Sequence, residues 1–100
     1  MLKAKAEILF SLPDRTYQGG KHLIPVFRFA EGLLFSGRIL GEAIEYMPNK
    51  SYLVDIDFFT IEDEAYSAIK PLLKPGLGLT IQEGARLTGI ATLVDYSYAQ

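Results

Sequence analysis

The strongest constraint on the fold is a strict two-residue alternation of apolar and polar side chains in two long segments. In residues 4–12, every second side chain from Ala4 to Leu12 is apolar, and the others are polar apart from Leu9. Residues 52–61 have a similar pattern: one face carries Tyr52, Val54, Ile56 and Phe58, and the other carries Leu53, Asp55, Asp57 and Phe59. Successive side chains of a β-strand point to opposite faces, so these segments are predicted to be strands with one buried face.

Four further segments have strand composition, with turn-forming residues between them: residues 22–29, 33–39, 77–81 and 86–95. Residues 22–29 and 33–39 are separated by Ala-Glu-Gly and are predicted to form a hairpin. Pro25 has no amide hydrogen and favours an edge, a bulge or a strand start. Gly37 is a possible bulge. The stretches 13–20 and 41–51 are predicted to be loops, and a polar tail containing tyrosines follows residue 95.

One segment, residues 62–73, is predicted to be helical. Ala65, Ile69 and Leu72 have the spacing of one helix face. The acidic run that opens the segment, residues 62–64, suits the positive end of a helix dipole. Pro71 restricts the helix because it interrupts the hydrogen-bond ladder.

Six or seven short strands with glycine and proline turns predict a small antiparallel barrel or sandwich. Closing the sheet would remove the exposed edges that such apolar strands otherwise present. The chain has 100 residues, of which 49% are hydrophobic, enough for one domain over residues 1–100. We therefore expect an all-β fold with one short helical insert.

Composition excludes several classes of function. The chain has no cysteine and one histidine, which excludes disulfides, a thiol nucleophile, thiolate zinc sites and the two-histidine motif of metalloproteases. We expect no metal and no cofactor. No apolar run approaches the roughly 20 residues that span a bilayer, and the N-terminus lacks the apolar core of a signal peptide. The expected location is cytoplasmic, with no membrane contact.

The candidate chemical groups each have a structural interpretation as well. His22 could act as a general base, but no nucleophile motif accompanies it, and a surface histidine is the preferred interpretation. Asp55 and Asp57 could serve in acid/base chemistry or bind a cation, yet two carboxylates on the polar face of a half-buried strand are more simply solvated. The Glu83–Gly84 step is typical of a hairpin turn with positive φ at Gly84. We expect no enzyme activity.

The tyrosines suggest either a protein contact surface or ordinary packing at the rim of the core. Most of them fall in the predicted loops, the helical insert and the tail. The six are Tyr17, Tyr46, Tyr52, Tyr66, Tyr96 and Tyr98.

Three segments together resemble the C-terminal barrel, the third domain, of elongation factor Tu. Residues 19–27, Gly-Gly-Lys-His-Leu-Ile-Pro-Val-Phe, are similar to the family's Gly-Gly-Arg-His-Thr-Pro-Phe-Phe. Residues 54–61 correspond to a family strand followed by an acidic stretch. Residues 78–91, Gly-Leu-Thr-Ile-Gln-Glu-Gly-Ala-Arg-Leu-Thr-Gly-Ile-Ala, are similar to the family's Arg-Phe-Ala-Ile-Arg-Glu-Gly-Gly-Arg-Thr-Val-Gly-Ala-Gly.

This resemblance implies a closed six-stranded antiparallel barrel that serves as a docking surface and performs no chemistry. The family's barrel contacts aminoacyl-tRNA, the exchange factor and its own GTPase domain. By correspondence, the binding residues are Lys21, His22, Gln82, Glu83, Gly84 and Arg86. The chain departs from the family at Gln82, where the family has arginine, and it has no phosphate loop and no GTPase domain. The segments 41–51 and 62–74 also differ from the family.

The sequence therefore predicts a non-catalytic module that binds a protein, such as a translation-associated adaptor or an immunity protein. An RNA- or tRNA-binding barrel is the alternative, and it predicts that five basic side chains converge on one face: Lys21, Lys50, Lys70, Lys74 and Arg86. The net charge of −2 does not favour it. A small-molecule barrel is a further alternative and predicts a pocket with converging polar groups. The oligomeric state is open.

Overall fold

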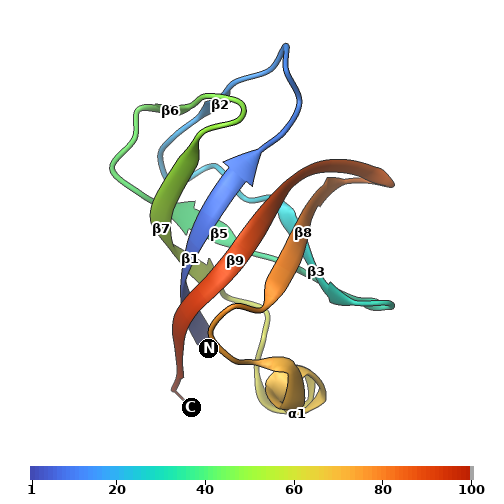
Figure 1. Ribbon diagram of the computed structural model, residues 1–100. Coiled ribbons are helices and arrows are strands. Elements are labelled where there is room, and N and C mark those ends of the chain that lie inside the picture. The colour runs from blue at the N-terminus through green and yellow to red at the C-terminus, as the bar shows by residue number, and fades with distance from the viewer. Residues whose placement is uncertain (100) are drawn as a thin grey trace.

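The alternating segments assemble into one curled antiparallel sheet of seven strands, a half-barrel with a short helix at one end (Figure 1). The computed structural model describes residues 1–99. The strands are β1 (Leu2–Phe10), β2 (Tyr17–Gln18), β3 (Val26–Ala30), β4 (Leu33–Ser36), β5 (Arg38–Leu40), β6 (Glu45–Tyr46), β7 (Ser51–Phe58), β8 (Gly78–Glu83) and β9 (Arg86–Tyr98). The strand order in the sheet is β4-β3-β8-β9-β1-β7-β5, and β2 pairs separately with β6.

The concave side of the sheet holds the core, as the alternation predicts. Side chains of β1 from Leu2 to Phe10 are buried at every second position, and Val54, Ile56 and Phe58 of β7 are buried beside them. The ring of Phe58 meets those of Phe27 and Phe29 edge to face, each at 5.2 Å between centroids. This arrangement suits the aromatic quadrupole and fixes β3 against β7 across the interior.

The prediction of a closed six-stranded barrel is wrong, because the hydrogen-bonded order runs from β4 to β5 and these two strands do not pair with each other. The predicted strand 33–39 divides at Gly37 into β4, which pairs with β3, and β5, which pairs with β7. A Cβ at Gly37 would lie 2.8 Å from both Ile56 Cγ2 and Phe58 Cε1, so only glycine fits this close approach. The ladder therefore ends at β4 on one side and at β5 on the other.

Two short strands lie within segments that we predicted to be loops. β2 falls in 13–20 and β6 in 41–51, and their ladder covers the end of the half-barrel opposite α1 (Figure 1). Tyr17 stacks on Phe10 at 4.1 Å between ring centroids, and Tyr46 meets Phe10 edge to face at 6.1 Å. These tyrosines close the core at that end.

The predicted helical insert is confirmed, but it is shorter than residues 62–73. Helix α1 (Asp63–Ile69) ends before Pro71 and passes into a 3₁₀ turn (Lys70–Leu72). Asp63 and Glu64 occupy the first helical turn, as the acidic run predicts. Ile69 is buried, which fixes the helix across the α1 end of the sheet.

The chain termini lie next to each other at the α1 end (Figure 1). The terminal ammonium of Met1 donates to the carbonyl of Ala99 at 2.5 Å. The predicted polar tail is largely strand, because β9 continues to Tyr98 and pairs with β1 up to Leu2. Within residues 1–99, no helix is both long and apolar enough to cross a membrane.

Candidate functional site

A surface groove opens beside the first half of β7, where β5 ends and the following segment turns away from β7. Two adjoining depressions, of about 410 Å³ and about 330 Å³, share Lys5, Leu40 and Asp55 in their walls. The larger is also bordered by Gly41, Glu42, Ala43 and Tyr46, and by residues 52–54 of β7. We call the two together the β5–β7 groove. It is formed partly by the segment 41–51, which was predicted to be a loop.

From Ser51 to Val54, β7 is paired with β1 on one side, and its other backbone edge, which faces the groove, has no strand beside it. The Ile39 amide donates to the Leu23 carbonyl at 2.9 Å and so points away from β7, which leaves Arg38 and Leu40 to bond with β7. Leu40 lies opposite Asp55. Backbone groups of an antiparallel strand alternate in direction, so Leu53 also turns its N–H and C=O toward the β5 side. In the described part of the chain, β5 has already ended there and no strand lies opposite Leu53.

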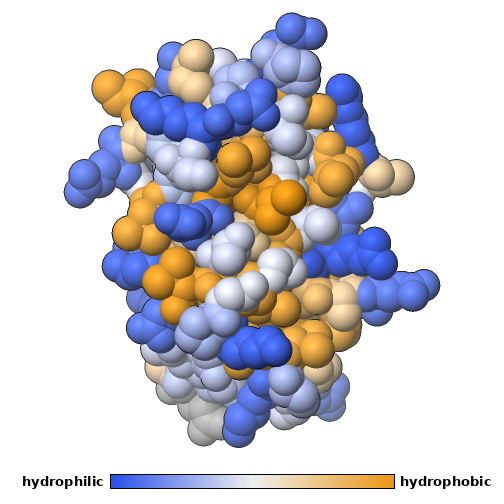
Figure 2. All heavy atoms as spheres, viewed as in Figure 1, coloured by the Kyte–Doolittle hydropathy of each residue, from blue (hydrophilic) through white to orange (hydrophobic). Residues whose placement is uncertain are grey.

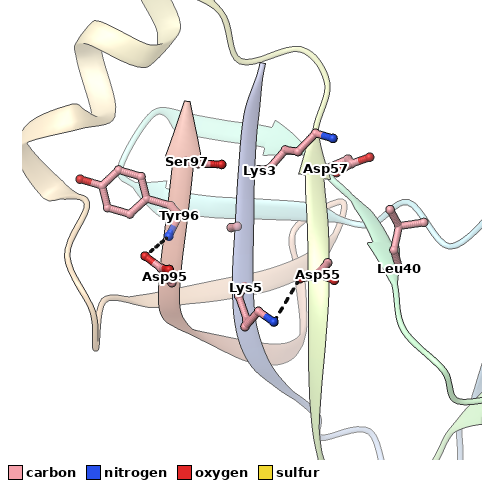
Figure 3. A pocket seen from close by; sticks show the side chains of 9 residues that line it. Lys3, Lys5, Leu40, Asp55, Asp57, Asp95, Tyr96 and Ser97 are labelled. Atoms are coloured by element: carbon pink, nitrogen blue, oxygen red, sulfur yellow. Dashed lines mark hydrogen bonds and ion pairs between the residues drawn. The ribbon is translucent and has the colours of Figure 1, made fainter. Parts of the chain in front are cut away.

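The charged wall of the groove consists of rows of side chains that run across neighbouring strands, and within each row positive and negative charges are neighbours (Figure 3). Lys5 lies between Asp55 on β7 and Asp95 on β9, and Lys3 lies opposite Asp57. The Lys5 ammonium is 3.8 Å from the Asp55 carboxylate. The two aspartates of β7 thus lie on the solvent side, as predicted, and neighbouring lysines offset their charge.

Exposed aliphatic side chains accompany these charges. Leu53 is 61% exposed and Leu40 is 38% exposed, although both belong to strands of the sheet. Figure 2 shows apolar patches, interrupted by charged residues, on the face that β1, β7 and β9 present. An apolar residue on the solvent side of a strand is common singly, but here two of them flank an unpaired backbone edge.

The floor of the groove contains a hydroxyl group that lacks a hydrogen bond. Tyr46 is 1% exposed, and its hydroxyl has no partner anywhere in residues 1–99. The neighbouring Tyr52 hydroxyl is satisfied, because it accepts the Met47 amide at 2.9 Å. Burial raises the pKa of Tyr46, and the nearby Tyr52 adds to the effect. An unpaired buried hydroxyl costs about 1–3 kcal/mol.

The residues suggested by the elongation factor resemblance fall into two groups. Lys21 and His22 are exposed in the turn before β3, and the Lys21 carbonyl accepts the Arg38 Nε at 2.9 Å. Gln82, Glu83, Gly84 and Arg86 lie at the β8–β9 turn, where φ of Gly84 is +59° as the turn prediction requires. No hydrogen bond or ion pair joins the two groups in the region that the structure describes.

Glu83 belongs to a polar cluster that the sequence did not suggest. Its carboxylate accepts Arg15 Nη1 at 2.7 Å and the Tyr17 hydroxyl at 3.1 Å, and the Arg15 guanidinium lies 4.9 Å from the Tyr17 ring centre. Burial raises the pKa of Tyr17, and the Glu83 hydrogen bond raises it further. Glu83 thereby ties the β8–β9 turn to the chain before β2.

The tyrosines pack inward, which favours packing over an exposed aromatic surface. Tyr17 and Tyr46 are buried, and the other four are half-buried against the core. Tyr66 and Tyr98 stack at 3.7 Å, and the Tyr98 hydroxyl accepts the Asp63 amide at 2.6 Å. Tyr66 and Tyr98 thereby join helix α1 to strand β9.

The basic residues of the RNA alternative lie at different ends of the molecule. Lys70 and Lys74 are at the α1 end, whereas Lys50 precedes β7 at the opposite end (Figure 1).

Comparison of the chain with known proteins gave no match: no family model matches it, and neither does any curated protein.

Sequence reasoning named Asp55, Asp57 and several tyrosines of the groove as candidates, but it did not bring them together as one site. Leu53 is the one apolar residue between Ser51 and Asp55 on the polar face of β7, and that break in the alternation was the available signal. Tyr46 was visible only as one of six tyrosines, and its proximity to Gly41 was not predictable because it depends on the path of the chain between β5 and β6.

Proposed function

We propose that this chain is a non-catalytic binding module and that its partner is a protein that docks at the β5–β7 groove. The observation that carries the proposal is the combination found there: exposed Leu40 and Leu53 beside an unpaired strand edge and the Lys5–Asp55 ion pair. Apolar contacts at the centre with polar groups around them are typical of protein interfaces.

The charge arrangement supports a protein more than a nucleic acid. Lys5 lies between two carboxylates, those of Asp55 and Asp95, and therefore presents no net positive field to phosphates. Affinity for RNA comes mostly from concentrated cations, and the groove instead alternates in sign. RNA binding remains the competing outcome of the experiment below.

Kinship with the third domain of elongation factor Tu belongs to the same proposal. Its support is the order of the three similar segments, which correspond to the chain leading into β3, to β7 and its exit, and to the β8–β9 hairpin. Under this proposal the chain is an independent docking domain, such as a translation-associated adaptor or an immunity protein. A fold shared with that family would not by itself transfer its partners.

The test is a comparison of three baits in a native lysate: the unchanged chain, Leu53→Lys in the groove, and Leu34→Lys as the control. Leu34 is an exposed leucine on β4, the edge strand remote from the groove in the ladder. We expect one protein to be retained by the unchanged chain and by Leu34→Lys, lost by Leu53→Lys, and to form a stoichiometric complex when purified. Recovery of RNA alone, or a protein retained equally by all three, would overturn the proposal.

A further inference from the structure

We infer that the partner contributes an extended segment that adds to the sheet as a strand, pairing with β7 beside residues 51–54 in the place that β5 vacates at Gly41. The inference rests on the proposed protein-binding function and specifies the form of the partner. Four residues of extended chain span about 13 Å, which is the scale of this edge.

The backbone of Leu53 gives the first argument. Its N–H and C=O point into the groove, and no strand of the described chain lies opposite them. Another extended backbone is the natural complement of an unpaired strand edge, because it offers donors and acceptors at the same spacing. Directly beyond, Asp55 already pairs with Leu40, so an added strand would continue the line of β5.

The buried hydroxyl of Tyr46 gives an independent argument. The hydroxyl lies in the floor of the groove against Gly41, and a Cβ added at Gly41 would collide with it. It has no hydrogen-bond partner among residues 1–99. A strand seated beside β7 brings carbonyl groups to this wall, and one of them can accept the hydroxyl proton when the Gly41 segment yields. Binding would thus satisfy a group that folding leaves unpaired.

The side chains that border the edge indicate what the segment carries. A residue placed opposite Leu53 shares its face of the sheet, so an apolar side chain there would cover Leu53 and Leu40. Glu42 is exposed at the groove and forms no ion pair within the described residues, unlike Asp55. A lysine or arginine near the end of the segment would pair with Glu42. The expected ligand is therefore an extended peptide with an apolar residue and a basic residue.

The probe is a phage-displayed library of random nine-residue linear peptides, selected against the intact chain. The most enriched peptide is then synthesised, and amide hydrogen exchange is followed by NMR with and without it. We expect the peptide to slow exchange of the Leu53 amide. Tyr46→Phe should weaken binding about fivefold, the loss of one ordinary hydrogen bond. Glu42→Gln should weaken it by a smaller factor that disappears at high salt.

A control separates loss of binding from loss of folding. Leu53→Pro removes the edge amide at a position where proline is tolerated, and Tyr46→Phe leaves the backbone intact, so we expect neither substitution to unfold the chain. Slower exchange at another site, no enriched peptide, or a chain that dimerises through Leu53 when alone would each overturn the inference. The three-bait comparison would still decide the proposed function, so the two can fail separately.

Discussion

The two halves of β7 have the same alternation of side chains but different neighbours. From Asp55 to Phe58, the strand lies between β1 and β5 and is paired on both sides, except for its last residue. From Ser51 to Val54, it is paired with β1 alone, and the groove lies along its other edge. The difference shows that the neighbouring strand β5, which ends before Gly41, decides which half of β7 is open to a partner.

The largest expected effect is the difference in stability between a substitution in the paired half of β7 and one in its open half. Phe58→Ala removes a fully buried ring that packs on Phe27 and Phe29, and we expect the free energy of unfolding to fall by about 3–5 kcal/mol. Leu53→Ala, in the open half, should change it by less than about 0.5 kcal/mol. Denaturant titration of both variants measures this; comparable losses would mean that Leu53 is part of the core.

A second substitution tests the exit of β5. Gly41→Ala places a Cβ against the Tyr46 hydroxyl and 2.8 Å from Val54 Cγ1. Both neighbours are buried, so overpacking should lower the free energy of unfolding by about 1–3 kcal/mol. Ala43→Ser, half-buried in the same segment, is the control and should have little effect. Thermal unfolding of the two variants measures the difference. A Gly41→Ala variant as stable as the unchanged chain would contradict this account.

Two tyrosine substitutions should change the free energy of unfolding in opposite directions. Tyr17→Phe removes a hydroxyl that donates to Glu83 at 3.1 Å and should lower the free energy of unfolding by about 1 kcal/mol. Tyr46→Phe removes a buried hydroxyl that has no partner in the described chain and should raise it by about 1 kcal/mol. Chemical denaturation of both variants checks the comparison. A loss of stability in Tyr46→Phe would show that its hydroxyl is satisfied.

The smallest effect concerns the charged wall. Lys5 and Asp55 are 50% and 64% exposed in their side chains and 3.8 Å apart, so their coupling should lie below about 1 kcal/mol. A double-mutant cycle with Lys5→Gln and Asp55→Asn measures it, and the coupling should shrink as salt is added. A larger, salt-independent coupling would indicate a pair that is shielded from solvent.

The sequence predicted the elements well because alternation along one strand is a local signal. The buried faces of β1 and β7 follow directly from it, and the β3–β4 hairpin and the turn at Gly84 follow from equally local signals, the short connectors that contain glycine. Closure of the sheet was not predictable in this way. Gly37 was recognised as a possible bulge, but which strands pair on either side of it depends on contacts between distant parts of the chain.

The groove was out of reach of the sequence for the same reason. Tyr17 and Tyr46 looked like loop residues because β2 and β6 have only two residues each, too short for a periodic pattern. Leu53 was visible as an apolar residue on a polar face. Its unpaired backbone becomes apparent only when the end of β5 at Leu40 is known.

Hydrogen exchange of the unbound chain tests the central claim, that β7 has an open edge, most directly. Tyr52 and Val54 should exchange slowly because their amides face β1, and Asp57 should be slow because it bonds to β5 opposite Arg38. The Leu53 amide, between two slow neighbours, should exchange at a rate close to that of an unprotected peptide. Protection of Leu53 equal to that of Val54 would contradict the account.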